Sequence, residues 1–280
     1  MALLPSGKTV WGLDIASSAI KGVKMRAAGG RVRILDADIL ALEGEPVASS
    51  DSPGRDRRIW RGLQRFQAKH DVATSRVAVG LPGPIFFTRP FSFPLVGARS
   101  EDDLARFELE QHIPFGLDAV LWDYALFEGV GSEAGIREGL LFAMKKEVLN
   151  NYLLSLSAAR IEPSCVQATQ LALYYFVRHE IDPEGTVLVM DVGAATTNLI
   201  AMNETRYWMR TLSVGAESVT AAVQGAFQPR KVSRREAEAI KVNLPLLTRR
   251  QEVSERISPA YAWSSAACAT RPPISRRSTR

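Results

Sequence analysis

The chain has 280 residues, with 35 Lys and Arg, 30 Asp and Glu, and a formal net charge of +5. Seven Arg and two Glu lie within residues 248–280, so residues 1–247 hold 28 basic and 28 acidic residues and are neutral. A neutral body argues against a nucleic-acid partner, which needs a basic surface. Cys165 and Cys268 are too few and too far apart for a disulfide framework or a structural zinc site.

Length and hydropathy narrow the class of protein further. A chain of this length can bury a sizeable core. It has no run of about 18 apolar residues, so we expect no membrane-spanning segment. It does not open with a signal peptide, so we expect a cytoplasmic protein. His70, His112 and His179 lack metal-ligand spacing, and we interpret them as ordinary core or surface histidines.

The first predicted element is a strand pair within residues 10–25. An apolar run leads to Asp14, a turn of small residues contains Ser17 and Ser18, and a second strand follows. Such a turn presents backbone N–H groups and hydroxyls to a phosphate, and an Asp at the strand end can meet Mg²⁺ through water. Any β-hairpin uses Gly, Asp and Ser in its turn, so a single copy is weak evidence for phosphate binding.

The next segments complete one lobe. They are expected to be a strand over 31–40, a loop over 43–55, a helix over 57–69 and a strand with a closing Pro/Gly turn over 76–84. The helix carries Ile59, Leu63 and Phe66 at helical spacing. The order β-β-β-α-β is that of a ribonuclease-H-like lobe.

The middle of the chain changes character and predicts a small inserted α/β subdomain over residues 84–159. Its expected elements are an aromatic strand over 86–94, a helix over 101–112 that ends before Pro114, strands over 119–127 and 138–144, and a helix over 145–159. Residues 163–178 then return to the first lobe as a strand that continues into a helix, and residues 182–185 form a linker.

Residues 187–202 repeat the design of the first hairpin. A buried strand is expected over 187–190, and it leads to Asp191, a small-residue turn with Thr196 and Thr197, and another strand. Two matched hairpins indicate a duplicated fold that clamps one nucleotide between two lobes. The lobe continues through residues 206–215, and Gly215 can turn tightly at the start of a helix.

The last predicted elements are two helices and a tail. The helices are expected over 217–227 and from Ser233, which is spaced from Glu236 as a capping box. Residues 248–280 lack periodicity and contain no Lys, and their end is typical of disorder. Three interpretations stay open: a regulatory basic tail, a membrane-surface tether, or non-native sequence from a shifted reading frame.

The expected fold is therefore α/β, two-lobed and actin-like, with an inserted subdomain. The predicted divisions are residues 1–83 with 160–183 for the first lobe, 84–159 for the insert, 184–247 for a partial second lobe and 248–280 for the tail. About 60 residues are too few for the second lobe to mirror the first.

Several segments resemble one family. The two Asp hairpins are similar to the phosphate motifs of the actin-like ATPase superfamily, and within it the chain is most similar to the PilM family of type IV pilus assembly proteins. The resemblance spans residues 8–247, and its most specific part is the Glu110-Gln-His-Ile-Pro-Phe115 segment. Further matching segments are residues 12–21, 122–124, 142–148, 161–173, 214–220 and 236–241. The insert also lies where FtsA and PilM proteins carry theirs.

This resemblance implies ATP and Mg²⁺ as cofactors and assigns roles to residues. Asp14 would order metal-bound water, and Asp14 and Asp191 would be the metal-site acids. The phosphates would be faced by Ser17, Ser18 and Lys21 from one lobe and by Asp191, Gly193, Thr196 and Thr197 from the other. Gly215 stands where a Gly-Gly pair is common. Gln167 lies near the position of a water-orienting Gln or Glu. Glu238 and Lys241 match a Glu-Xaa-Xaa-Lys pair that approaches adenosine, or they form a solvated helix face.

The sequence also departs from the family pattern. Ala16 replaces a Gly, and Ala194 and Ala195 stand in a turn that is usually richer in Gly, which reduces φ freedom near the phosphates. A later Gly-rich adenosine motif is absent from the chain, so ATP binding is expected to be weak or lost.

Partners are implied by the same resemblance. They are the N-terminal cytoplasmic segment of a PilN-like inner-membrane protein, which would bind between the first lobe and the insert, and other pilus platform proteins. The aromatic stretch 86–93 is either a wall of that groove or ordinary core of the insert.

The function that follows is a nucleotide-binding scaffold of type IV pilus or related secretion assembly, at most a slow ATPase, held at the inner membrane by its partners. Two rivals remain. A sugar or small-molecule kinase of the superfamily would need a catalytic Asp in the substrate cleft, and no persuasive second acidic motif is present. A secretion-platform protein that binds no nucleotide is favoured by Ala16 and by the missing motif.

Overall fold

The computed structural model describes residues 9–28, 31–44, 54–94, 100–127, 135–182, 184–227, 231–243 and 255. The strands are β1 Thr9–Ile15, β2 Ala19–Ala28, β3 Arg31–Ala41, β4 Arg76–Leu81, β5 Phe86–Pro94, β6 Val120–Leu126, β7 Ile136–Lys145, β8 Cys165–Ala168, β9 Val187–Val192, β10 Thr197–Met202 and β11 Tyr207–Leu212. The α-helices are α1 Arg55–His70, α2 Glu101–His112, α3 Lys146–Ala158, α4 Thr169–Phe176, α5 Ala216–Ala226 and α6 Arg234–Asn243. Short helical turns are η1 Val72–Thr74, η2 Gly83–Ile85, η3 Leu117–Ala119 and the π-helical η5 Val177–Ile181.

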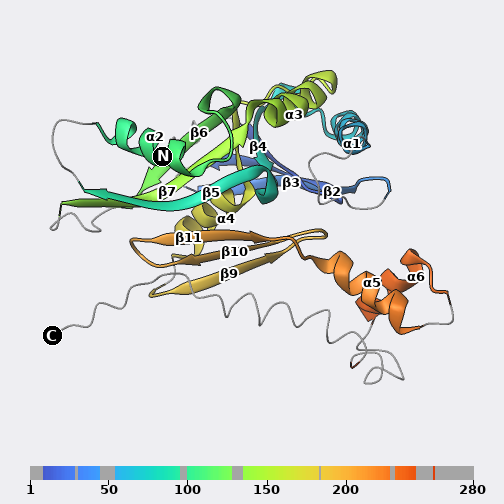
Figure 1. The fold of residues 1–280 in the computed structure, drawn as a ribbon. Helices are drawn as coiled ribbons and strands as arrows, with labels where there is room; N and C mark the ends of the chain where they lie inside the picture. Colours follow the sequence, from blue (N-terminus) through green and yellow to red (C-terminus); the bar gives the residue numbers. More distant parts are fainter. Residues whose placement is uncertain are drawn as a thin grey trace.

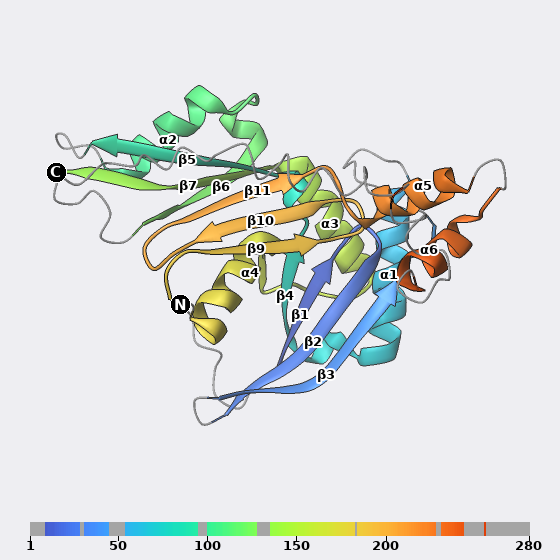
Figure 2. The same cartoon turned by 90° about the horizontal axis from the view of Figure 1, so that it is seen from below.

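The largest sheet has the strand order β3-β2-β1-β4-β8 (Figures 1 and 2). β1, β2 and β3 pair antiparallel, whereas β4 pairs parallel with β1 and with β8. This is the β-β-β-α-β lobe that the sequence predicts, with β8 added by the segment that returns after the insert. Both parallel strands therefore end at the same edge as β1, and that edge carries the Asp14 turn.

One face of this sheet holds the main core. Trp11 packs edge-on against Phe66 of α1, with ring centroids 5.4 Å apart, and both side chains are fully buried. Tyr152 and Leu156 of α3 belong to the same buried cluster. Helix α3 therefore packs on α1 and the first lobe, although its residues lie within the predicted insert. The domain boundary at residue 159 stays a prediction.

A second sheet, β5-β7-β6, is covered by α2. Phe91 and Phe93 of β5 are buried in its core together with Leu109 of α2 and Leu141 of β7. These two rings therefore belong to the core and do not form the wall of a groove, because alternation along the strand directs both toward α2. Phe86 and Phe87, at the start of β5, stay partly exposed.

The third sheet has the order β11-β10-β9, and both pairs are antiparallel. Ile200 and Met209 of this sheet pack with Leu140 and Phe142 of β7 and with Val177. The expectation that β9 is buried is wrong on one face: Leu188, Met190 and Val192 are exposed, since the described residues pack against the opposite face of the sheet.

Helices α5 and α6 share a small apolar cluster. The capping box is confirmed: Glu236 N–H donates to Ser233 Oγ at 3.2 Å, and Ser233 N–H donates to Glu236 Oε2 at 2.9 Å.

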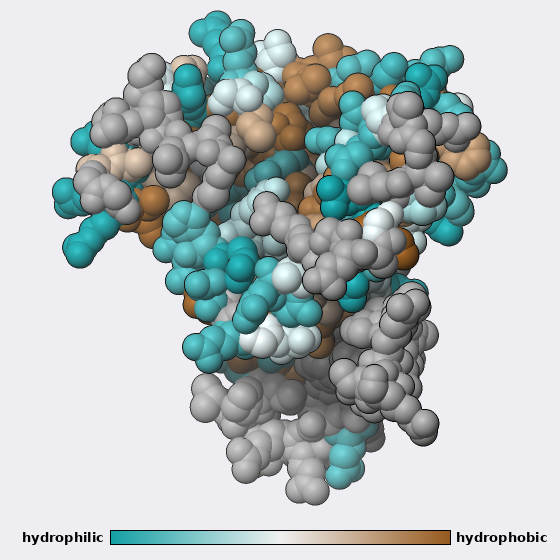
Figure 3. Space-filling view, turned by 90° about the vertical axis from the view of Figure 1, so that its left-hand side faces the viewer, coloured by the Kyte–Doolittle hydropathy of each residue, from teal (hydrophilic) through white to brown (hydrophobic). Residues whose placement is uncertain are grey.

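Apart from Glu255, the predicted tail lies outside the described residues. None of the helices in the described part of the chain has the length and hydropathy of a membrane span. On the face shown in Figure 3, hydrophobic residues gather toward the middle and the top, and hydrophilic residues lie to either side of them.

Candidate functional site

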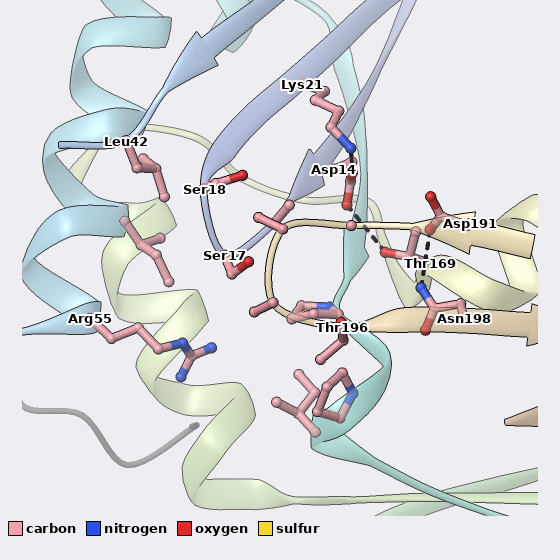
Figure 4. Close-up of a pocket in the computed structure, with 18 of the residues that line it drawn as sticks. Asp14, Ser17, Ser18, Lys21, Leu42, Arg55, Thr169, Asp191, Thr196 and Asn198 are labelled. Atoms are coloured by element: carbon pink, nitrogen blue, oxygen red, sulfur yellow. Dashed lines mark hydrogen bonds and ion pairs between the residues drawn. The ribbon is translucent and has the colours of Figure 1, made fainter. Parts of the chain in front are cut away.

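The β1–β2 turn and the β9–β10 turn face each other across a cleft that is partly open to solvent (Figure 4). Its polar lining consists of Asp14, Ser17, Ser18, Lys21, Thr169, Asp191, Thr196 and Asn198, with Arg55 and Arg58 on another side. Its other lining residues are Ala16, Leu42, Ile59, Pro82, Pro84, Ile85, Tyr152, Gly193, Ala194 and Ala195. The cleft therefore brings together the two hairpins that the sequence singles out.

Asp14 is held at both carboxylate oxygens. Lys21, its partner across the β1–β2 pair, donates from Nζ to Oδ2 at 3.1 Å. The hydroxyl of Thr169 lies 3.2 Å from Oδ1 and 3.0 Å from the carbonyl oxygen of Leu81. The Asp14 and Lys21 side chains are still 28% and 48% exposed. A hydrated cation can therefore reach the carboxylate from the cleft.

Asp191 occupies the matching place in the second hairpin. It pairs across the strands with Asn198, whose Nδ2 donates to Asp191 Oδ2 at 3.1 Å. The turn between them is closed by a hydrogen bond from Gly193 N–H to the Thr196 carbonyl at 2.9 Å. The two hairpins thus place one carboxylate each beside a turn of small residues.

Gly215 supports the second turn from behind. A Cβ at this position would lie 2.5 Å from the Ala194 carbonyl oxygen and 2.6 Å from that of Gly193. The next two N–H groups, of Ala216 and Glu217, donate to the same two carbonyls at 2.9 Å. The beginning of α5 is therefore bonded to the turn backbone, and Gly215 acts by close approach rather than by lining the cleft.

Thr197 and Gln167 were predicted as site residues, and both lie outside the cleft lining. Thr197 is fully buried and donates its hydroxyl to the Val214 carbonyl at 2.8 Å, because strand alternation directs it away from the side that Asn198 faces. Gln167 lies in β8 opposite Gly80, outside the cleft lining. Thr169, two residues farther along, is the residue that meets Asp14, and a Thr at a strand-to-helix junction is the signal that could have found it.

Glu238 and Lys241 also lie outside the cleft lining. They form an ion pair at 2.8 Å, and Lys241 Nζ donates to Thr220 Oγ1 at 2.9 Å and to the Ala216 carbonyl at 3.3 Å. The Thr220 hydroxyl also contacts Glu238. Here the pair joins α6 to the first turns of α5, and contact with adenosine stays a prediction. Burial raises the pKa of Glu238, but hydrogen bonds from Lys241 and Thr220 outweigh it and lower the pKa below 4.5.

This ion pair predicts a pH dependence. A carboxylate whose pKa is lowered on folding stabilises the protein above its unfolded pKa, and that stabilisation is lost as the pH falls through the folded pKa. We expect Glu238→Gln to lower Tm at pH 7 and the difference from the parent protein to shrink below about pH 4.5. Thermal unfolding from pH 7 to pH 3 measures this, with the exposed Glu204→Gln as control. A Tm difference that stays constant to pH 3 would contradict it.

Cations complete the electrostatics of the cleft. Arg55, the first residue of α1, points into it (Figure 4), and its side chain is 11% exposed with the guanidinium 4.6 Å from the ring centre of Tyr152. With Lys21 and Arg58, it gives the cleft three basic groups beside two acids. Basic and acidic groups in one cleft can bind an anion and its bound cation at the same time. The sequence reasoning missed Arg55 because a single Arg at a helix start carries no motif.

The donor set fits Mg²⁺ bound to a phosphate. Among the described residues, no three His, Cys, Asp or Glu side chains are grouped to hold a metal ion by themselves. Mg²⁺ does not need such a cage, because it keeps several waters and binds through one or two carboxylates together with substrate phosphates. Asp14 and Asp191 would supply those carboxylates, and the hydroxyls of Ser17, Ser18 and Thr196 line the space where phosphate oxygens would lie.

Residues 12–252 match the model of a family described as type IV pilus assembly protein PilM. The chain belongs to the PilM family. Among solved structures, the PilM family chain is similar to a PilM-PilN type IV pilus biogenesis complex, with a TM-score of 0.75 and 19% identity over 92% of this chain and 74% of that one.

Two other structures share the fold of the PilM family chain. The cytoplasmic domain of EpsL, an inner-membrane component of the Vibrio cholerae type II secretion system, gives a TM-score of 0.50 and 12% identity over 80% of each chain. MreB 5 of Spiroplasma citri bound to AMPPNP gives 0.51 and 10% over 96% of this chain and 81% of that one. The predicted α/β actin-like fold is therefore confirmed, and so is the resemblance to PilM.

Proposed function

We propose that this PilM family chain is a nucleotide-binding scaffold of type IV pilus assembly, which binds Mg-ATP in the cleft and docks the cytoplasmic segment of an inner-membrane partner. One observation carries the nucleotide part: Asp14 and Asp191, each beside a turn of small residues, face each other across one cleft. The likeness to MreB 5 bound to AMPPNP supports this choice of ligand.

The residues of the cleft define what bound Mg-ATP would meet. The metal ion would neutralise phosphate charge, and Asp14 and Asp191 would hold its waters. Ser17, Ser18 and Thr196 would donate hydroxyls to phosphate oxygens. Lys21 is already paired with Asp14, so it balances the carboxylate until the cation arrives.

A scaffold is favoured over a kinase by the acids of the cleft. Among the described residues, the acidic side chains that line the cleft are those of Asp14 and Asp191. Both lie beside the turns that would hold the phosphates. A kinase of sugars or other small molecules needs a further carboxylate that accepts the proton of the substrate hydroxyl. We therefore expect at most slow hydrolysis of ATP.

The partner part of the proposal is supported by the solved PilM-PilN complex. A PilN-like protein would hold this chain at the cytoplasmic side of the inner membrane, where other pilus platform proteins would also contact it. The expected groove lies between the first lobe and the insert, and the partly exposed Phe86 and Phe87 lie at that junction. Bound nucleotide would change the affinity for the partner only if the nucleotide binds two arrangements of the lobes with different affinities.

Calorimetric titration tests the proposal. Mg-ATP, ATP with EDTA, and the partner's cytoplasmic peptide are titrated separately, and the peptide is then titrated again in the presence of Mg-ATP. Micromolar, magnesium-dependent ATP binding and a changed peptide affinity are the expected results. ATP binding with an unchanged peptide affinity would remove the switch and leave a scaffold that binds nucleotide.

A nucleotide-free platform protein is the second candidate, and it is favoured by Ala16 and by Ala194–Ala195 in the two turns. Each Cβ reduces the φ freedom that Gly would bring to a phosphate loop. Peptide binding without any detectable binding of Mg-ATP would establish this candidate.

A further inference from the structure

A row of hydrogen bonds leads from α4 to Asp191. Gln170 is 2% exposed, and its Nε2 donates to the hydroxyl of Thr211 in β11. That hydroxyl donates to Asn198 Oδ1 at 2.9 Å, and Asn198 Nδ2 donates to Asp191 Oδ2 at 3.1 Å. We call these four side chains the Gln170 relay. Asp191, Asn198 and Thr211 are cross-strand pairs on neighbouring strands, whereas the contact between Gln170 and Thr211 joins α4 to this sheet across 41 positions.

The charge on Asp191 sets the direction of every bond in the Gln170 relay. An ionised carboxylate only accepts, so Asn198 must present its NH₂ group to Asp191 and its oxygen to Thr211. The single hydroxyl proton of Thr211 is then used on that oxygen. Gln170 must therefore offer its NH₂ group. Its Oε1 is buried without a hydrogen-bond partner, which is the cost of this orientation.

The surroundings leave the relay little room for another arrangement. Gly83 lies against it so closely that a Cβ there would overlap both Thr211 Oγ1 and the Gln170 amide. The residue before Gln170, Thr169, contacts Asp14 directly. Two consecutive residues at the start of α4 therefore reach both acids of the cleft, one directly and one through two intermediates.

We propose that Gln170 is a positioning residue that orients the Asp191 carboxylate through Thr211 and Asn198. This deepens the proposed function and rests on it where nucleotide is concerned. Asp191 lies in the sheet of β9, β10 and β11, whereas Asp14 lies in the five-stranded sheet. The Gln170 relay and the Thr169 contact tie both acids to one helix start, so the separation of the two metal-site acids is set there.

Thr211 offers the sharpest variant, because Thr211→Val keeps the side-chain shape and removes the hydroxyl, while Thr211→Ser keeps the hydroxyl. We expect Thr211→Val and Gln170→Leu to weaken Mg-ATP binding about tenfold while binding of ATP in EDTA changes less than twofold. Thr211→Ser should stay within threefold of the parent protein. If the role of these residues is purely structural, the variants will change Tm but leave the ratio of the affinities for Mg-ATP and for ATP in EDTA unchanged. That result would overturn the proposal.

A second measurement decides the matter without nucleotide. Chemical unfolding of Asp191→Asn, Thr211→Val and the double variant gives a mutant cycle. Independent sites multiply their effects on the unfolding equilibrium constant, whereas coupled sites depart from the product. We expect a departure of at least threefold. Simple multiplication would overturn the Gln170 relay, and failure of the parent protein to bind Mg-ATP would count against the proposed function while this cycle still tests the relay.

Discussion

Replacing Asp14 with Ala is expected to weaken magnesium-dependent binding of ATP by roughly 30-fold or more. The carboxylate is one of two acids in the cleft lining among the described residues, and no neighbouring acid can take over its contact with the hydrated metal. Removing one partner of a close charge contact costs about 2–5 kcal/mol, which is a loss of roughly 30-fold or more in affinity. Calorimetric titration of Mg-ATP and of ATP in EDTA measures the change.

The fold of this variant should survive. Asp14 and Lys21 form an ion pair that is partly exposed, and such pairs contribute little to stability. Asp118→Ala, at an exposed position of η3, is the matched control and should bind Mg-ATP like the parent protein. A folded Asp14→Ala protein that binds Mg-ATP with unchanged affinity would place the nucleotide elsewhere and refute the site.

Replacing Phe66 with Ala is expected to lower the free energy of unfolding by about 3–5 kcal/mol, since deletion of a buried ring removes transfer free energy and leaves a cavity. The ring is fully buried and lies 5.4 Å from the ring of Trp11 and 4.6 Å from that of His70. The gap cannot close easily, because Gly22 of β2 already packs against Phe66 as closely as a glycine permits. Urea unfolding followed by fluorescence measures the loss.

Phe107 provides the control for this substitution. It lies in α2 and is 51% exposed, so Phe107→Ala should change the free energy of unfolding by no more than about 0.5 kcal/mol. Equal losses at both positions would mean that the cluster around Trp11 is not the main core of the first lobe.

Local chemistry explains why some predictions could be made from sequence. Helix α2 has the predicted bounds because its ends are marked: Ser100 Oγ accepts from Asp103 N–H at 3.1 Å, and Pro114 follows closely. The two hairpins were also predictable, since an apolar strand, an Asp and a turn of small residues recur at two places. A pattern of this kind needs no knowledge of distant contacts.

Other features depend on which strands become neighbours. The sequence could not tell that Phe91 and Phe93 face α2, that one side of β9 is exposed, or that α3 packs on α1. In each case the residue pattern permits either outcome, because burial is decided by the element that covers a face. The packing of the three sheets makes that choice.

The sequence by itself determined the two Asp hairpins, the order of elements of the first lobe and the family, because local patterns and motifs specify these features. The tertiary structure alone decided which polar residues meet in the cleft. Thr169 reaches Asp14 from 155 positions away, and Gln170 reaches Thr211 across 41. Thr197 turns away from the same cleft although its neighbours line it. Hydrogen bonds between distant segments depend on how the sheets pack, and no local pattern specifies their partners.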